Sequence, residues 1–237
     1  MMEGGHLTVH RGAQLVSREE LAIIPAPPAT DTWKPVSHIA LVETIAGVMA
    51  DRGLYITKEQ FAVQGPRLFG VFDTEWQKMS DFGAAVGFRH GINKDLAIHL
   101  LCGARVWLCD NLSYSGQQIT VRKHSAKLNL GEEMDRALYK YMQEWRRFKD
   151  AIQLQKDTTL EERRVKQLVY DIFQAKILPL RLFPPVTTHV LQMTKEAKTA
   201  MTGWWLHNVM TTHIKTLAPA PAFRATARLG KFFAAKF

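Results

Sequence analysis

Cationic and aromatic side chains alternate between residues 67 and 127, and their types suggest a specific chemistry. Lys and Arg pair with phosphates while aromatic rings stack on exposed bases, so a sheet face or groove that carries both can hold single-stranded nucleic acid. The candidate phosphate contacts are Arg89, His90, Lys94, Arg105, Arg122, Lys123 and Lys127, and the candidate stacking residues are Phe88 and Tyr114. A simpler alternative stays open: most of the aromatic residues belong to the core, and the run VRKH at 121–124 is a solvated strand end.

Acidic residues in the same part of the chain suggest a second chemistry. Asp73 and Glu75 alternate in the run FDTEW, and Asp81, Asp95 and Asp110 follow. Alternate residues of a strand share a face, so a carboxylate cluster could bind magnesium for phosphodiester cleavage. No lysine follows at the short fixed spacing of common nuclease signatures, and hairpin ends collect acidic residues in any case. A metal-dependent nuclease is therefore the first alternative.

Imidazole and thiolate groups raise the question of a metal site. His99, Cys102, Cys109 and His124 are potential zinc ligands, but they do not form two close ligand pairs, and the deaminase signature is absent. The sequence also lacks the glycine-rich phosphate-binding motifs and the nucleophile motif Gly-x-Ser-x-Gly. We expect no metal and no cofactor; catalytic activity stays open, with a non-enzymatic protein favoured.

The charge balance favours a polyanionic partner. The 237 residues contain 31 Lys and Arg against 22 Asp and Glu, a net charge of +9. No acidic residue follows Glu196, whereas six basic residues do: Lys198, Lys215, Arg224, Arg228, Lys231 and Lys236. This tail could contact DNA, an anionic membrane or a neighbouring subunit, or it could be a packed terminal helix.

The order of predicted elements indicates an α+β protein. Prolines make 1–35 an arm, in which Ser17 and Glu20 form a capping-box pattern, and apolar residues at helical spacing predict a helix at 38–51. Short β-branched and aromatic runs then predict an antiparallel sheet of about four or five strands. Long helices follow. The first begins after Asn129, the second is capped by Thr158 or Thr159 and stops near Pro179, and the third contains Gly203; Pro184 and Pro185 lie in the linker between the last two. We expect three parts: the arm 1–35, an α+β core 36–156 that ends in a long helix, and a helical region 157–237 with a basic tail.

Two further patterns bear on location. The chain has only two cysteines, and no run approaches the roughly 18 apolar residues of a membrane span. The amino terminus also lacks the apolar segment of a signal peptide. The expectation is a cytoplasmic protein without a transmembrane segment.

Several segments, in order, resemble a known family. They are WKPVSH at 33–38, RLFGVF at 67–72, GFRHGINKDLAI at 87–98, GARVWLCDNLSYSG at 103–116, VRKHSAKL at 121–128 and the late run WWLHNVMTTHI. Together they are similar to the phage and plasmid-like proteins catalogued as a domain of unknown function. One departure is HGINKD, which stands where that family has a serine-containing turn, so a role tied to that hydroxyl does not carry over. The resemblance implies a phage or mobile-element context, with replication, recombination, repair or anti-defence as the usual occupations.

A broader likeness concerns the fold. A helix, an antiparallel meander and a long helix resemble the core of single-strand annealing recombinases, which bind the DNA backbone in a basic groove and assemble into rings. The leading hypothesis is thus a DNA-binding protein of a mobile element that binds or anneals single strands, as a homo-oligomer. The alternatives are a metal-dependent nuclease and a protein-interaction or anti-defence module.

Overall fold

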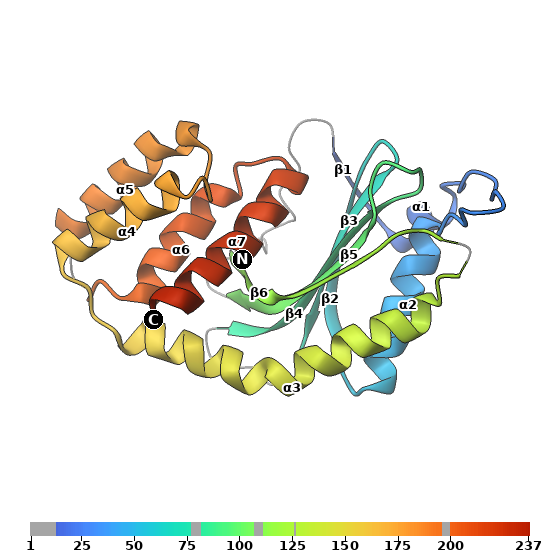
Figure 1. The fold of residues 1–237 in the computed structure, drawn as a ribbon, viewed down its shortest axis with the longest axis horizontal. Helices are drawn as coiled ribbons and strands as arrows, with labels where there is room; N and C mark the ends of the chain where they lie inside the picture. The colour runs from blue at the N-terminus through green and yellow to red at the C-terminus, as the bar shows by residue number, and fades with distance from the viewer. Residues whose placement is uncertain (1–12, 77–81, 107–110, 126, 196–199) are drawn as a thin grey trace.

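The chain folds around one antiparallel sheet (Figure 1). The computed structural model describes residues 13–76, 82–106, 111–125, 127–195 and 200–237, with the backbone alone described at 105–106, 111–122, 195, 219 and 220. The six strands lie in sequence order, each antiparallel to the next. They are β1 (Gln14–Val16), β2 (Ile56–Gln64), β3 (Arg67–Thr74), β4 (Phe82–Gly91), β5 (Ile98–Val106) and β6 (Asn111–Arg122). The predicted α+β fold is confirmed, and the short edge strand β1 adds to the predicted meander.

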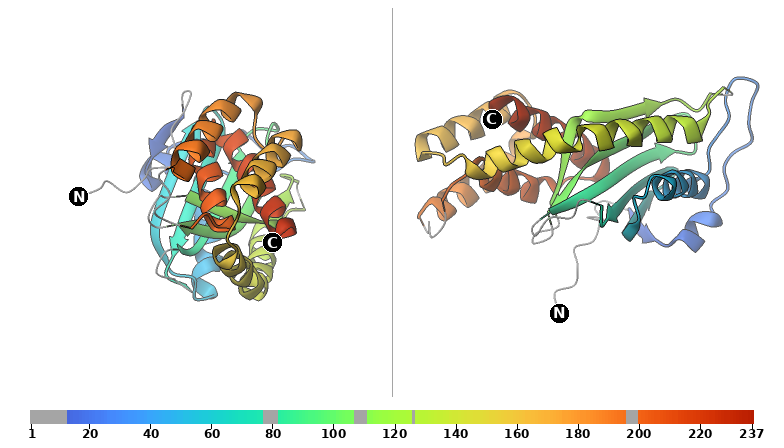
Figure 2. Two further views of the ribbon diagram at one scale, coloured as in Figure 1. Left: turned by 90° about the vertical axis from the view of Figure 1, so that its left-hand side faces the viewer. Right: turned by 90° about the horizontal axis from the view of Figure 1, so that it is seen from below.

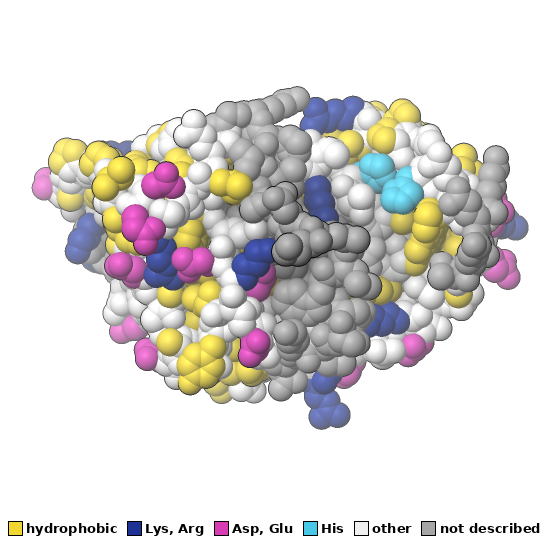
Figure 3. Space-filling model, turned by 180° about the vertical axis from the view of Figure 1, so that it is seen from behind, with side chains coloured by type: hydrophobic (Ala, Val, Ile, Leu, Met, Phe, Trp, Pro, Cys, Tyr) yellow, Lys and Arg dark blue, Asp and Glu magenta, His cyan; other side chains and the backbone are white. Residues whose placement is uncertain are grey.

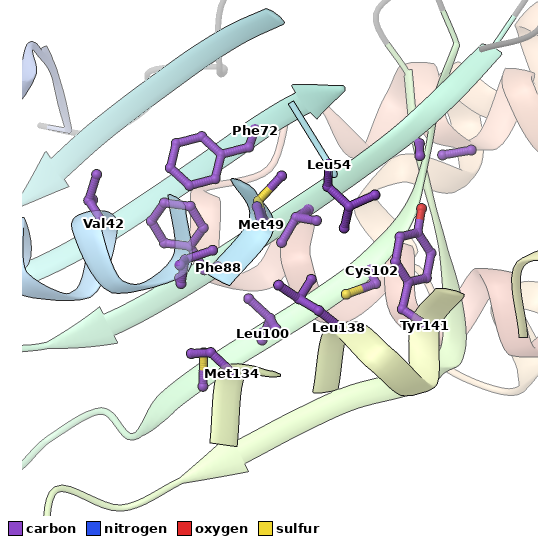
Figure 4. Close-up of a cluster of buried hydrophobic side chains, with 14 of the residues drawn as sticks. Val42, Met49, Leu54, Phe72, Phe88, Leu100, Cys102, Met134, Leu138 and Tyr141 are labelled. Carbon is purple, nitrogen blue, oxygen red and sulfur yellow. The ribbon is translucent and has the colours of Figure 1, made fainter. Parts of the chain in front are cut away.

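Two helices cover one face of the sheet. These are α2 (His38–Asp51) and α3 (Leu130–Asp157), which lie beneath the strands in Figure 1 and in front of them when the molecule is seen from below in Figure 2. Side chains alternate between the faces of a strand, and the even-numbered residues of β3, β4 and β5 point toward these helices. Phe72, Phe88 and Leu100 accordingly pack with residues of α2 and α3 in one buried cluster (Figure 4). We call this the helix-covered face and the opposite side the second face.

The first two helices begin as the sequence predicts. The short helix α1 (Arg18–Ala22) begins with the predicted capping box between Ser17 and Glu20. The predicted helix at 38–51 is confirmed as α2, whose first turn is capped by the Ser37 side chain. Gly53, just beyond this helix, has a φ of 71°, a conformation that glycine adopts without steric cost.

The long helix α3 connects the sheet to a second group of helices. At 1.5 Å per residue, its 28 residues extend for about 42 Å. It is fixed to the sheet by Tyr141, whose buried hydroxyl donates a hydrogen bond of 2.6 Å to the Gly103 carbonyl. Beyond it, α4 (Glu162–Gln174), η1 (Leu180–Leu182), α5 (Phe183–Lys195), α6 (Gly203–Ile214) and α7 (Pro219–Lys236) surround their own apolar core.

Three predicted details of this helical region are wrong. Pro184 and Pro185 lie in the first turn of α5 rather than in a linker, because the first turn of a helix needs no backbone donors from them. Gly203 begins α6 instead of lying inside a helix, since the Thr202 side chain caps the helix there. Thr158 ends α3 and does not cap α4, which starts after Glu161.

The described residues contain no helix that is both long enough and apolar enough to cross a membrane.

Candidate nucleic-acid interface

Three segments that carry four exposed lysines come together at the end of the sheet where α2 begins. Trp33 pairs with Ser125 in an isolated antiparallel bridge, which joins the segment before α2 to the segment after β6. Lys34 adjoins Trp33 in sequence, and the Lys94 ammonium lies 5.3 Å from the centre of the Trp33 ring. Two more exposed lysines, Lys123 and Lys127, lie two residues on either side of Ser125. We call Lys34, Lys94, Lys123 and Lys127 the lysine cluster.

Two backbone hydrogen bonds shape the segment that carries Lys123 and Lys127. The Ser125 amide donates to the Lys123 carbonyl at 2.9 Å, and the Leu128 amide donates to the Ser125 carbonyl at 3.0 Å. In the part of the chain that the structure describes, no carboxylate forms an ion pair with a member of the lysine cluster. Their charges are therefore available to an anionic partner.

Three buried histidines support this surface from below. The Val36 amide donates to His124 Nδ1 at 3.2 Å, and the His124 ring stacks on His90 with ring centres 5.6 Å apart. His90 Nε2 in turn lies 2.9 Å from His38 Nδ1, at the start of α2. This chain of contacts fixes the Trp33 segment, β4 and the segment after β6 in one arrangement.

The histidines themselves carry no charge at neutral pH. Burial lowers the pKa of His38 to about 4. Burial, together with the neighbouring His38 and His124, holds the pKa of His90 well below its usual range. The prediction that His90 contacts phosphate is therefore wrong, because its ring is fully buried and neutral. The ring instead packs between His38 and His124.

The structure also corrects the assignment of Phe88. Its ring is fully buried on the helix-covered face, 5.0 Å from the Phe72 ring and 6.2 Å from the Phe61 ring, and it fills the space above Gly70. A base at the surface cannot stack on it. Phe88 is a core residue because even-numbered positions of β4 face α2 and α3.

The remaining predicted contacts divide into two groups. Arg105 lies on β5, and Tyr114 and Arg122 lie on β6; only the backbone of these three residues is described, and Arg122 pairs with Ile98 in the sheet. Arg89 lies on the second face of the sheet, away from the histidines, and is 5% exposed beneath Phe223. The structure therefore brings together Lys94, Lys123 and Lys127 among the predicted residues, and it buries Arg89.

Trp33 and Lys34 are the residues of this interface that were not proposed as contacts from the sequence. Both belong to the run WKPVSH, whose only signal was family resemblance. A tryptophan beside a lysine becomes meaningful for binding only once a distant segment, here 123–127, is placed next to it.

The basic tail is a packed helix rather than an extended segment. Phe223 and Ala227 of α7 pack on Leu101 of the second face. Arg228 donates hydrogen bonds of 2.7 Å to the carbonyls of Ala175 and Lys176, and so satisfies acceptors at the end of α4. Part of the tail's positive charge is thus used within the fold.

The described carboxylates considered for a nuclease have different surroundings. Asp73 is buried on the second face, Glu75 is exposed, and Asp95 is bonded to Arg67 at 2.8 Å. Among the described residues, no three or more His, Cys, Asp or Glu side chains are grouped to hold a metal ion. Asp81, Asp110 and Cys109 lie outside the described residues.

Charge on the face seen in Figure 3 is mixed. Lys and Arg side chains there are spread among Asp and Glu side chains and do not gather into one patch. Comparisons with protein-family models, with curated proteins and with solved structures found no match to this chain. The resemblance to the phage and plasmid-like family therefore stays a prediction.

Proposed function

We propose that this protein binds nucleic acid, and single-stranded DNA in particular, through the lysine cluster. The observation that carries the proposal is the convergence of four exposed lysines from three separate segments around Trp33. Ammonium groups that neutralise phosphates release condensed counterions, which is the main source of affinity in non-specific nucleic-acid binding.

The support for single strands comes from the aromatic residue within the cluster. Trp33 is half-buried, with Lys94 against its ring. Unpaired bases present faces on which such a ring can stack, whereas the bases of a duplex are already stacked on one another. Binding or annealing of strands within a mobile element, by a homo-oligomer, is the wider form of this proposal.

A binding experiment with matched variants tests the proposal. Fluorescence anisotropy would measure the affinity for a labelled single-stranded oligonucleotide and for its duplex at low salt. The variant Lys94→Gln/Lys123→Gln/Lys127→Gln should bind the single strand about tenfold or more weakly than the original protein.

The control removes the same charge elsewhere. Lys58, Lys140 and Lys166 are exposed lysines on β2, α3 and α4, away from Trp33. Changing all three to Gln should leave binding nearly unchanged. Equal losses in the two triple variants would show that net charge, and not the lysine cluster, determines binding.

The two alternatives have direct tests of their own. Incubation of DNA with the protein and magnesium or manganese would reveal a nuclease, and size-exclusion chromatography with light scattering would give the oligomeric state. A partner retained after nuclease treatment in a purified, two-component pull-down would favour the protein-interaction module.

A further inference from the structure

Arg89 is a buried cation with two nitrogen atoms that find no hydrogen-bond acceptor among the described residues. It lies on β4 and points to the second face of the sheet, where its side chain is 5% exposed. Nε and Nη1 are buried, and neither has a hydrogen-bond partner within the described part of the chain. The guanidinium lies over the face of Phe223, 4.9 Å from the ring centre.

Among the residues whose side chains are described, the surroundings of Arg89 are more positive than negative. Burial is the main cause that lowers the pKa of Arg89 to about 10, and the charges of Arg224 on α7 and Arg67 on β3 lower it further. His99 faces Arg89 across the β4–β5 pair, and burial together with Arg89 lowers the pKa of His99 to about 4. The nearby carboxylate, Asp95, is already bonded to Arg67.

An arginine in this position is protonated at neutral pH and is costly to bury. A charge removed from water destabilises the fold unless a counter-charge or hydrogen bonds compensate. A cation–π contact recovers only a small part of this cost. On its own strand, glycines 87 and 91 flank Arg89 on the same face, so no side chain of β4 screens the guanidinium.

We propose that Arg89 is the centre of a binding site for an oxyanion, the phosphate or carboxylate group of a small ligand, on the second face of the sheet beside α7. The guanidinium is the protein group best suited to such oxygens, because its N–H groups are fixed in a plane and stay charged. Arg224, exposed on α7 next to Phe223, adds positive charge at the same place. This site is independent of the proposed nucleic-acid interface, because Arg89 points to the second face whereas His90 points to the helix-covered face.

NMR of the arginine Nε–H groups tests the proposal on the intact protein. Inorganic phosphate and acetate would be titrated separately at constant ionic strength, with chloride as the balancing anion. The Arg89 signal, identified by its absence in Arg89→Lys, should shift saturably with phosphate, acetate or both, and the stronger of the two identifies the preferred oxyanion. No saturable shift of any arginine Nε–H signal in either titration would overturn the proposal, whether or not the variant folds.

Thermal unfolding provides a second readout that a purely structural role would not reproduce. Arg89→Met removes the buried charge but keeps an unbranched apolar side chain, so without added oxyanion its midpoint should equal or exceed that of the original protein. The increase that the preferred oxyanion produces should be lost in Arg89→Met and kept in Arg164→Gln, a control on the exposed surface of α4. An equal increase in all three proteins would mean that the anion acts through general solvent effects, and would overturn the proposal. Loss of DNA affinity in the lysine variants bears on neither result.

Discussion

The replacement of Phe88 by leucine tests whether Phe88 is a core residue or a residue on which bases stack. The Phe88 ring is fully buried and contacts two other rings, with centres 5.0 Å and 6.2 Å away, at Phe72 and Phe61. Truncation of such a phenylalanine to alanine typically destabilises a protein by about 3–5 kcal/mol, and each aromatic pair contributes about 0.5–1.5 kcal/mol beyond buried area. Leucine keeps most of the volume, so Phe88→Leu should lower the free energy of unfolding by about 1–2 kcal/mol.

Two measurements on the same variant decide the matter. Urea unfolding gives the change in stability, with an unchanged slope indicating that the fold is kept. Fluorescence anisotropy of the folded variant should give the same oligonucleotide affinity as the original protein, because the ring does not reach the surface. A stable Phe88→Leu protein with an affinity reduced tenfold would refute the assignment of Phe88 to the core.

Three other perturbations test separate parts of the structure. His38 has a pKa of about 4 in the folded protein against about 6.5 in the unfolded chain, so the unfolded state binds more protons below pH 6.5. As the pH falls from 6.5 to 4, the free energy of unfolding should decrease by up to about 1.4 kcal/mol per pH unit because of this group. Urea unfolding should show a shallower decrease in His38→Gln. Tyr141→Phe removes the buried hydrogen bond to Gly103 and should cost about 1–2 kcal/mol in the same assay, whereas no loss would mean that water replaces the hydroxyl. Gly70→Ala places a methyl group against the Phe88 ring and should destabilise by about 1–3 kcal/mol; a crystal structure of a fully stable variant would show that the ring can move aside.

The class of fold follows from periodicity that is visible in the sequence. The helix at 38–51 and the long helix after Asn129 have apolar residues at helical spacing, and burial of one face satisfies that pattern in the structure. The strands between them were recognisable by β-branched and aromatic runs. The ends of the helices were less predictable. The helical pattern of the sequence continues on the amino-terminal side of Thr202, but α6 begins only after this residue, which caps it.

The candidate interface was predictable only in part. Lys94, Lys123 and Lys127 could be chosen as exposed cations from their polar surroundings, but Phe88 and His90 belong to the same run GFRHG and point into the core. A one-residue difference in a strand changes the face, and the sequence alone did not indicate which face α2 and α3 would cover. The contribution of Trp33 depends on a pairing across 92 residues of chain, which no local pattern encodes.

The salt dependence of single-strand binding tests the central claim most directly. The slope of log K against log salt is negative, and each lost phosphate contact reduces its magnitude by about 0.7 for single strands. The variant Lys94→Gln/Lys123→Gln/Lys127→Gln should therefore have a slope that is smaller in magnitude by about 2 than that of the original protein. The control Lys58→Gln/Lys140→Gln/Lys166→Gln should keep the original slope. A slope that is unchanged in the lysine-cluster variant, or reduced equally in both variants, would contradict the assignment of this surface to nucleic-acid binding.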